Sequence, residues 1–186
     1  VVLVDDFARR DMILRELDAI GQRLNREDQF VFVFSGLAVS GSESDDSFLI
    51  CSDTSINTSP ARRGEIESAI GARDLYQALN RIRARTSVFL DTDSNVVWEE
   101  IASAPNDRLT CFGASGNGGH AREGRFGELY FGVFSHTVTE ALLNSNPSYQ
   151  QLFDLVFQAY RARGFSQLPF FAGDLEQRPF AASARR

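Results

Sequence analysis

Two acidic side chains, Asp91 and Asp93, are the residues of this chain best placed to do chemistry. They directly follow an apolar run at residues 86–90, which is typical of a buried strand, and they open a small polar turn. In an open α/β sheet, ligands bind just outside the carboxyl ends of central strands. With Asp53, the pair could bind a divalent cation through oxygen ligands, or it could instead cap a helix or bind turn amides.

The two histidines of the chain differ in their settings. His120 lies in a glycine-rich stretch, residues 115–128, which predicts a long flexible loop beside the carboxyl end of the sheet. There it could approach the acidic turn and act as a base, or it could be an exposed loop histidine without a role. His136 lies in a region that predicts a helix start, and we interpret it as structural.

Neither the cysteines nor the glycines form a recognisable catalytic motif. Cys51 and Cys111 each lie in a strand-like apolar run and match no metal or redox spacing, so we predict reduced, inert core thiols. The cysteines do not determine the cellular compartment of the protein, and the cytoplasm is the favoured expectation. Residues 113–119 are rich in glycine but lack the spacing of a dinucleotide-binding loop and the lysine of a phosphate-binding one.

Composition narrows the class of protein. The 186 residues are 43% apolar, with 16 Phe, which predicts one folded domain with a sizeable core. No apolar run approaches the length of a membrane span, and the formal charge of −6 argues against nucleic acid or anionic membranes as partners. All 19 basic residues are Arg, so lysine chemistry is excluded. Basic partners are the more natural expectation.

Strand-like and helix-like segments alternate along the chain, which predicts a three-layer α/β domain with a mostly parallel sheet. The expected strands cover residues 1–4, 30–34, 48–51, 86–90, 109–114 and 168–172. The expected helices cover residues 13–24, 72–83, a short segment around 97–101, 131–143 and 147–164. Pro169 places the last strand at an edge of the sheet. We expect a single domain over residues 1–180 and a frayed tail at 181–186.

Two of these strand ends resemble the active-site motifs of the caspase and metacaspase family of cysteine proteases. The segment 35–38, Ser-Gly-Leu-Ala, is similar to the family's Ser-Gly-His-Gly signature, with Leu37 at the position of the catalytic histidine. The segment 90–95 is similar to the family's Leu-Asp-(Ser/Thr)-Cys motif, with Asp93 at the position of the catalytic cysteine. Both catalytic residues are therefore replaced.

Further short motifs follow in the family's order over residues 1–180. They are residues 48–53, 83–86, 112–115, 132–135, 167–169 and 172–175. The resemblance implies the caspase-like fold, with a mostly parallel central sheet and an edge strand near the C-terminus. The family begins with one strand and one helix more than this chain. Because residues 1–4 match its second strand, we expect the central first strand upstream.

The replacements predict a pseudoprotease. Leu37 cannot accept a proton from a nucleophile, and the carboxylate of Asp93 is a poor nucleophile toward an amide. In metacaspases the acid at the position of Asp91 helps to line a pocket for Arg or Lys. The resemblance therefore implies an acidic pocket here, in which Asp93 strengthens the preference for a basic group and Asp53 is a further contributor. The resemblance thus implies a regulatory module, without cofactor or metal, that binds a protein or peptide, such as a basic one that contains Arg.

Two rival functions stay open at this stage. The chain could be a hydrolase with a different set of catalytic residues, such as Asp91 and Asp93 around a metal, or His120 as the base. It could also be an assembly subunit in which another chain completes the missing first strand or pairs with the last one. Pro169 and the acidic charge make pairing between copies through the last strand doubtful.

Overall fold

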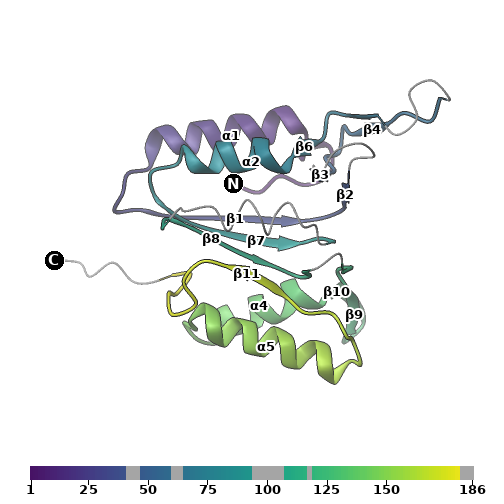
Figure 1. Cartoon of the computed structure of the whole chain (residues 1–186), viewed down its shortest axis with the longest axis vertical. Coiled ribbons are helices and arrows are strands. Elements are labelled where there is room, and N and C mark those ends of the chain that lie inside the picture. The colour runs from purple at the N-terminus through teal and green to yellow at the C-terminus, as the bar shows by residue number, and fades with distance from the viewer. Residues whose placement is uncertain (41–46, 60–64, 94–106, 117–118, 181–186) are drawn as a thin grey trace.

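The computed structural model describes residues 1–40, 47–59, 65–93, 107–116 and 119–180. Its centre is a four-stranded sheet in the order β1 (Gln29–Ser35), β7 (Arg85–Asp91), β8 (Leu109–Gly113) and β11 (Phe170–Ala172). The first three strands are parallel, and β11 runs antiparallel to β8 at the edge (Figure 1). The predicted α/β fold with a mainly parallel sheet and a C-terminal edge strand is confirmed.

Helices cover both faces of the sheet. On one face lie α1 (Arg10–Arg23) and α2 (Ala72–Asn80), and on the other lie α4 (Val133–Asn144) and α5 (Tyr149–Ala162) (Figure 1). None of the helices in the described part of the chain is long and apolar enough to span a membrane. With helices on both faces of the sheet, the molecule has the three layers that the alternation of segments predicts.

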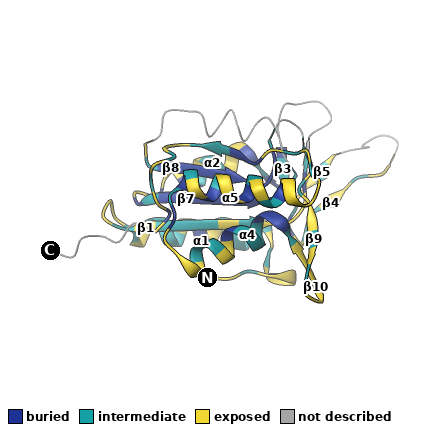
Figure 2. Cartoon of the chain, turned by 90° about the horizontal axis from the view of Figure 1, so that it is seen from below, coloured by how far each residue is buried: buried dark blue, intermediate teal, exposed yellow. Residues whose placement is uncertain are grey.

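Each face of the sheet has its own hydrophobic core. One core joins α1 and α2 to the sheet through side chains such as Leu17, Leu75 and Val88, and the other joins α4 and α5 through Phe112 and Val156. Strand β7 lies between both cores, and six of its seven residues are buried (Figure 2). This explains its apolar residues at 88–90, because a parallel strand covered on both faces has no solvent-facing side.

The predicted helices mostly form where expected. Helix α5 begins at a capping box in which Ser148 and Gln151 exchange side-chain and backbone hydrogen bonds, and it is followed by Gly164 at φ +73°. Helix α2 ends at Asn80, three residues before the predicted end. The predicted short helix around 97–101 and the predicted tail at 181–186 lie outside the described residues.

Short strands form three small sheets outside the central one. One contains β2 (Ala38–Ser40), β3 (Ser47–Leu49) and β6 (Ile70–Gly71), and the second pairs β4 (Ser55–Ile56) with β5 (Ile66–Glu67). The third is a hairpin of β9 (Glu123–Phe126) and β10 (Leu129–Gly132), which turns at Gly127 with φ +63°.

Two predictions for the region of this hairpin are wrong. Residues 115–128 are not one long loop, because 123–126 form β9, and the helix predicted from residue 131 begins only at Val133, because the residues before it form β10. Four-residue strands carry too little periodicity to be separated from loop or helix, and here the pairing and the stack of Phe126 on His136 decide the outcome.

The prediction of a strand at residues 1–4 is also wrong. Residues 1–4 form no strand, and Val1 and Val2 are each 84% exposed. A turn of 3-10 helix, η1 (Asp5–Phe7), follows them. An apolar, β-branched run forms a strand only when a partner takes up its backbone hydrogen bonds, and within the described residues no strand pairs with this segment.

Candidate functional site

A pocket lies where β1 and β7 end. Ser35 pairs with Asp91 in the register of the two parallel strands, and the backbone N–H of Gly36 donates to the carbonyl of Asp91 at 3.2 Å. The two chains therefore leave the sheet side by side, and Leu37 and Asp93 line one cavity of about 620 Å³. Its remaining lining residues come from both strand ends, the hairpin region and the end of α5: Ser35, Gly36, Asp91, Ala121, Arg122, Glu123, Gly132 and Phe165.

Asp91 lies at the inner wall of this pocket and is bound to the start of α4. Its side chain accepts the backbone N–H of Ser135 at 3.2 Å and the hydroxyl of the same residue. Ser135 is the third residue of α4, so the carboxylate takes one of the free amides at the helix N-terminus. This geometry matches the helix-capping alternative for Asp91, although the helix is α4 and not the segment that directly follows it in sequence.

Burial dominates the electrostatics of Asp91. The residue is only 6% exposed, and loss of water raises the pKa of its carboxyl above the ordinary value, while the two hydrogen bonds from Ser135 lower the pKa and the charge of Glu123 raises it. The close approach also requires Gly132, because a Cβ there would lie within 2.8 Å of the Asp91 Cγ. Asp91 is therefore a positioned, largely desolvated group.

Asp93 is the more accessible carboxylate of the pair. Its Oδ2 lies 3.2 Å from Nδ1 of His120, and its Oδ1 accepts the backbone N–H of Ala121 at 2.8 Å. The side chain of Asp93 is 35% exposed and that of His120 is 70% exposed. The structure thus brings His120 to the acidic turn, at the outer rim of the pocket.

The hairpin region adds two charged residues that sequence reasoning missed. Glu123 supplies a further carboxylate, and Arg122 supplies a guanidinium whose carbon lies 6.0 Å from the ring centre of Phe165. Both fall within residues that the sequence predicts to be loop, and only the pairing of β9 with β10 fixes their position. In the sequence, only the charged residues of this glycine-rich stretch, next to a predicted strand end, indicate that it contributes to a site.

Asp53 does not join this pocket. It accepts the backbone N–H of Arg10 at 3.0 Å and lies 3.9 Å from Nε of Arg9, so it caps the N-terminus of α1. The expectation that it contributes to the acidic pocket is not met by this placement, because the segment after β3 turns toward α1.

The metal and thiol alternatives gain no support from the geometry. Within the described ranges, no three His, Cys, Asp or Glu side chains gather as metal ligands. Burial raises the pKa of the Cys51 thiol to about 11, and burial also raises the pKa of Cys111. Both thiols are buried in the α1–α2 core, away from the pocket.

Comparison with known proteins relates the chain to others by fold. No family model matches the sequence, and no curated protein matches it. Among solved structures, the crystal structure of protein GSU0716 from Geobacter sulfurreducens is similar, with a TM-score of 0.66 and 17% sequence identity. The match covers 98% of this chain and 82% of that one. At this identity the likeness establishes a shared α/β fold.

Proposed function

We propose that this chain is a catalytically inactive caspase-like domain that binds a basic segment of a partner protein in the pocket at the ends of β1 and β7. The observation that carries the proposal is the meeting of Leu37 and Asp93 in one cavity. They come from neighbouring strand ends, in the positions where the family resemblance expects the catalytic histidine and cysteine.

The chemistry of these two side chains argues against peptide cleavage by the family mechanism. Leu37 has no atom that accepts a proton, and the carboxylate of Asp93 already accepts the backbone N–H of Ala121. Removal of one member of a catalytic pair typically lowers the rate by about 10⁴-fold or more. A domain with both members replaced retains the shape of the cleft without its reaction.

The charge of the pocket favours a basic ligand. Of the described lining residues, Asp91, Asp93 and Glu123 supply three carboxyl groups, and Arg122 supplies one guanidinium. Burial favours the neutral form of Asp91, so Asp93 and Glu123 are the charges that a ligand meets first. The planar guanidinium of an arginine side chain can pair with a carboxylate through two parallel hydrogen bonds, which makes Arg the preferred basic group.

A matched pair of peptides tests this proposal. We expect a fluorescent peptide with a central Arg to bind, and the same peptide with citrulline, which is nearly isosteric and neutral, to bind at least about tenfold more weakly. The variant Asp93→Asn combined with Glu123→Gln should lose this preference, whereas Asp154→Asn combined with Glu140→Gln, two exposed carboxylates of α5 and α4, should keep it. Equal binding of both peptides by the native protein would refute a basic-ligand pocket.

The pairing of His120 with Asp93 favours one rival function, a hydrolase. An aspartate that holds Nδ1 of a histidine leaves Nε2 as a base that can activate water. Under this alternative, Arg- or Lys-containing peptides are cleaved, and His120→Ala abolishes the cleavage. Under the pseudoprotease proposal, incubation with the same peptides yields no product above that of a heat-denatured sample. A thermal-shift screen with divalent ions covers the metal-dependent form of the rival.

An assembly role has a more limited basis. Strand β1 forms one edge of the four-stranded sheet and contains neither a charged residue nor a proline, the usual features that protect an edge from pairing. At the other edge, Pro169 directly precedes β11. If the chain joins an assembly by strand addition, β1 is therefore the better edge. A concentration-independent monomer mass in light scattering would count against association between copies.

A further inference from the structure

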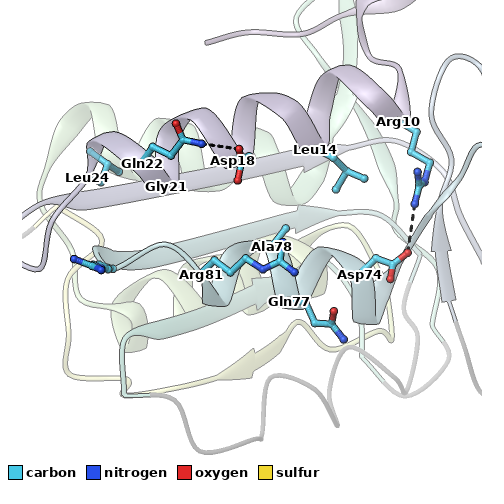
Figure 3. A pocket seen from close by; sticks show the side chains of 11 residues that line it. Arg10, Leu14, Asp18, Gly21, Gln22, Leu24, Asp74, Gln77, Ala78 and Arg81 are labelled. Atoms are coloured by element: carbon cyan, nitrogen blue, oxygen red, sulfur yellow. Dashed lines mark hydrogen bonds and ion pairs between the residues drawn. The ribbon is translucent and has the colours of Figure 1, made fainter.

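A basic cleft lies at the opposite end of the sheet from the acidic pocket. One cavity of about 620 Å³ runs between α1 and α2 (Figure 3). A second of about 1010 Å³ lies beside the turns that lead into β1 and β7. Arg81 and Arg83 line both cavities, so the two are adjacent. We define the basic cleft by the residues of the second cavity: Asn25, Arg26, Glu27, Asn80, Arg81, Arg83 and Arg108.

The charge of this cleft opposes that of the whole chain. Among the described residues that line the cleft, four guanidinium groups face one carboxylate, Glu27, whereas the protein carries a formal charge of −6. Arg26, Arg81 and Arg83 are exposed, and none of the three guanidinium groups has a hydrogen-bond or ion-pair partner among the residues that the structure describes. Like charges gathered in a cleft raise the local concentration of ions of opposite charge.

Part of the cleft is held in place by the backbone. Nη1 of Arg108 donates to the carbonyls of Ile82 and Arg83 at 3.4 and 3.3 Å, which ties the start of β8 to the turn before β7. At the far end of the first cavity, Arg10 pairs with Asp74 at 3.5 Å (Figure 3). Because Asp74 balances the charge of Arg10, the unbalanced positive charge lies at the amino end of the sheet.

Helix capping explains only one of these arginines. Arg81 is the C-cap of α2, where a cation compensates the partial negative charge of the helix end. Arg26 comes from the turn after α1, Arg83 from the turn before β7, and Arg108 from the segment before β8. Arg108 holds the turn before β7 through its two backbone hydrogen bonds. Arg26 and Arg83 have neither role, and their convergence with Arg81 on one cleft favours an anionic ligand.

The lining of the cleft narrows the class of that ligand. Among the described lining residues of the two cavities there is no aromatic side chain on which a nucleic-acid base could stack. The arginines are instead spread along an open groove. Carboxylates on successive side chains of an extended peptide can each meet one guanidinium fork.

We propose that the basic cleft binds an acidic, Asp- or Glu-rich segment of a second protein. This surface is independent of the acidic pocket, because it is formed by the turns at the amino ends of β1, β7 and β8. One domain would then hold a basic partner at one end of its sheet and an acidic partner at the other.

Fluorescence anisotropy with a labelled peptide of alternating Glu and Asp tests the proposal directly, with the matched Gln–Asn peptide as the neutral probe. We expect binding of the acidic peptide alone, and a loss of at least about tenfold between roughly 50 and 300 mM salt, as screening requires. The variant Arg26→Gln combined with Arg83→Gln should weaken binding by about tenfold or more. Arg15→Gln combined with Arg161→Gln removes the same charge elsewhere and should change the affinity by less than about twofold.

Three outcomes would overturn the proposal. They are equal binding of the acidic and neutral peptides, equal losses in the two double variants, and no binding of the acidic peptide at low salt. Inorganic pyrophosphate provides a further comparison, since tight, saturable binding of pyrophosphate without binding of the peptide would identify a small-anion site in place of a protein-binding surface. Circular dichroism and melting curves establish that each variant is folded.

Discussion

Oδ2 of Asp93 lies 3.2 Å from Nδ1 of His120, so the histidine occupies one face of the carboxylate that a basic ligand would use. The other oxygen of Asp93 is taken by the backbone N–H of Ala121. A guanidinium that enters the pocket must therefore share or displace the imidazole. This arrangement makes His120 an internal competitor for the proposed ligand.

Removal of the imidazole should strengthen binding of an Arg-containing peptide. We expect His120→Ala to improve the affinity by about two- to fivefold, because a single hydrogen bond to the carboxylate no longer has to be exchanged. Asp93→Asn should weaken the same binding. Titration of the labelled peptide into both variants gives the two affinities. A weaker complex with His120→Ala would mean that the histidine itself contacts the ligand.

The buried carboxyl of Asp91 should make stability depend on pH. Because burial raises its folded-state pKa above the ordinary 3.8, its contribution to the free energy of unfolding is fully present below that value and is lost as the pH rises through the folded-state pKa. Asp91→Asn has no charge to desolvate. The stability of the native protein relative to this variant should therefore fall as the pH increases above about 4. Urea denaturation of both proteins across this range measures the difference, and a relative gain with increasing pH would contradict it.

Two glycines should respond to alanine with opposite signs. Gly132→Ala places a Cβ against the carboxylate of Asp91 and should destabilise the fold by about 1–3 kcal/mol. Gly21→Ala lies within α1, where the new Cβ meets Ile82 at an ordinary 3.6 Å, and should stabilise it by about 0.5–1 kcal/mol.

Thermal or chemical denaturation measures both glycine variants. Replacement of Asp91 by alanine in the Gly132→Ala background should recover part of the loss, because the collision is removed. If the two losses simply add, the collision is not the cause of the destabilisation.

The two thiols should resist alkylation while the protein is folded. Burial raises the pKa of Cys51 to about 11 and also raises that of Cys111, so both are protonated near neutral pH and inaccessible to reagent. Iodoacetamide at pH 8 should label neither residue in the native protein and both in urea, as read by mass spectrometry. Rapid labelling of either thiol in the folded state would restore it as a candidate nucleophile.

The sequence determined the layered fold and the place of the pocket. The apolar residues of β7 and β8 point to both faces of the sheet and require cover on each. Their alternation with amphipathic segments such as α1 and α5 leaves few arrangements other than a parallel sheet between helices. Asp91 and Asp93 directly follow a buried strand, so their position at the carboxyl end of the sheet follows from the chain itself. The type of each element and the end of each strand depend on neighbouring residues, so the spacing of apolar and polar residues along the chain predicts them.

Only the tertiary structure decided which side chains meet. The register of β1 on β7 brings Leu37 to Asp93, and the pairing of β9 with β10 brings Arg122 and Glu123 to the same pocket. Asp53 carries the same chemical group as Asp93, yet it caps α1. Residues 1–4 have the composition of a strand but no strand partner among the described residues. Pairing and burial are long-range contacts, and the spacing of residues along the chain does not encode them.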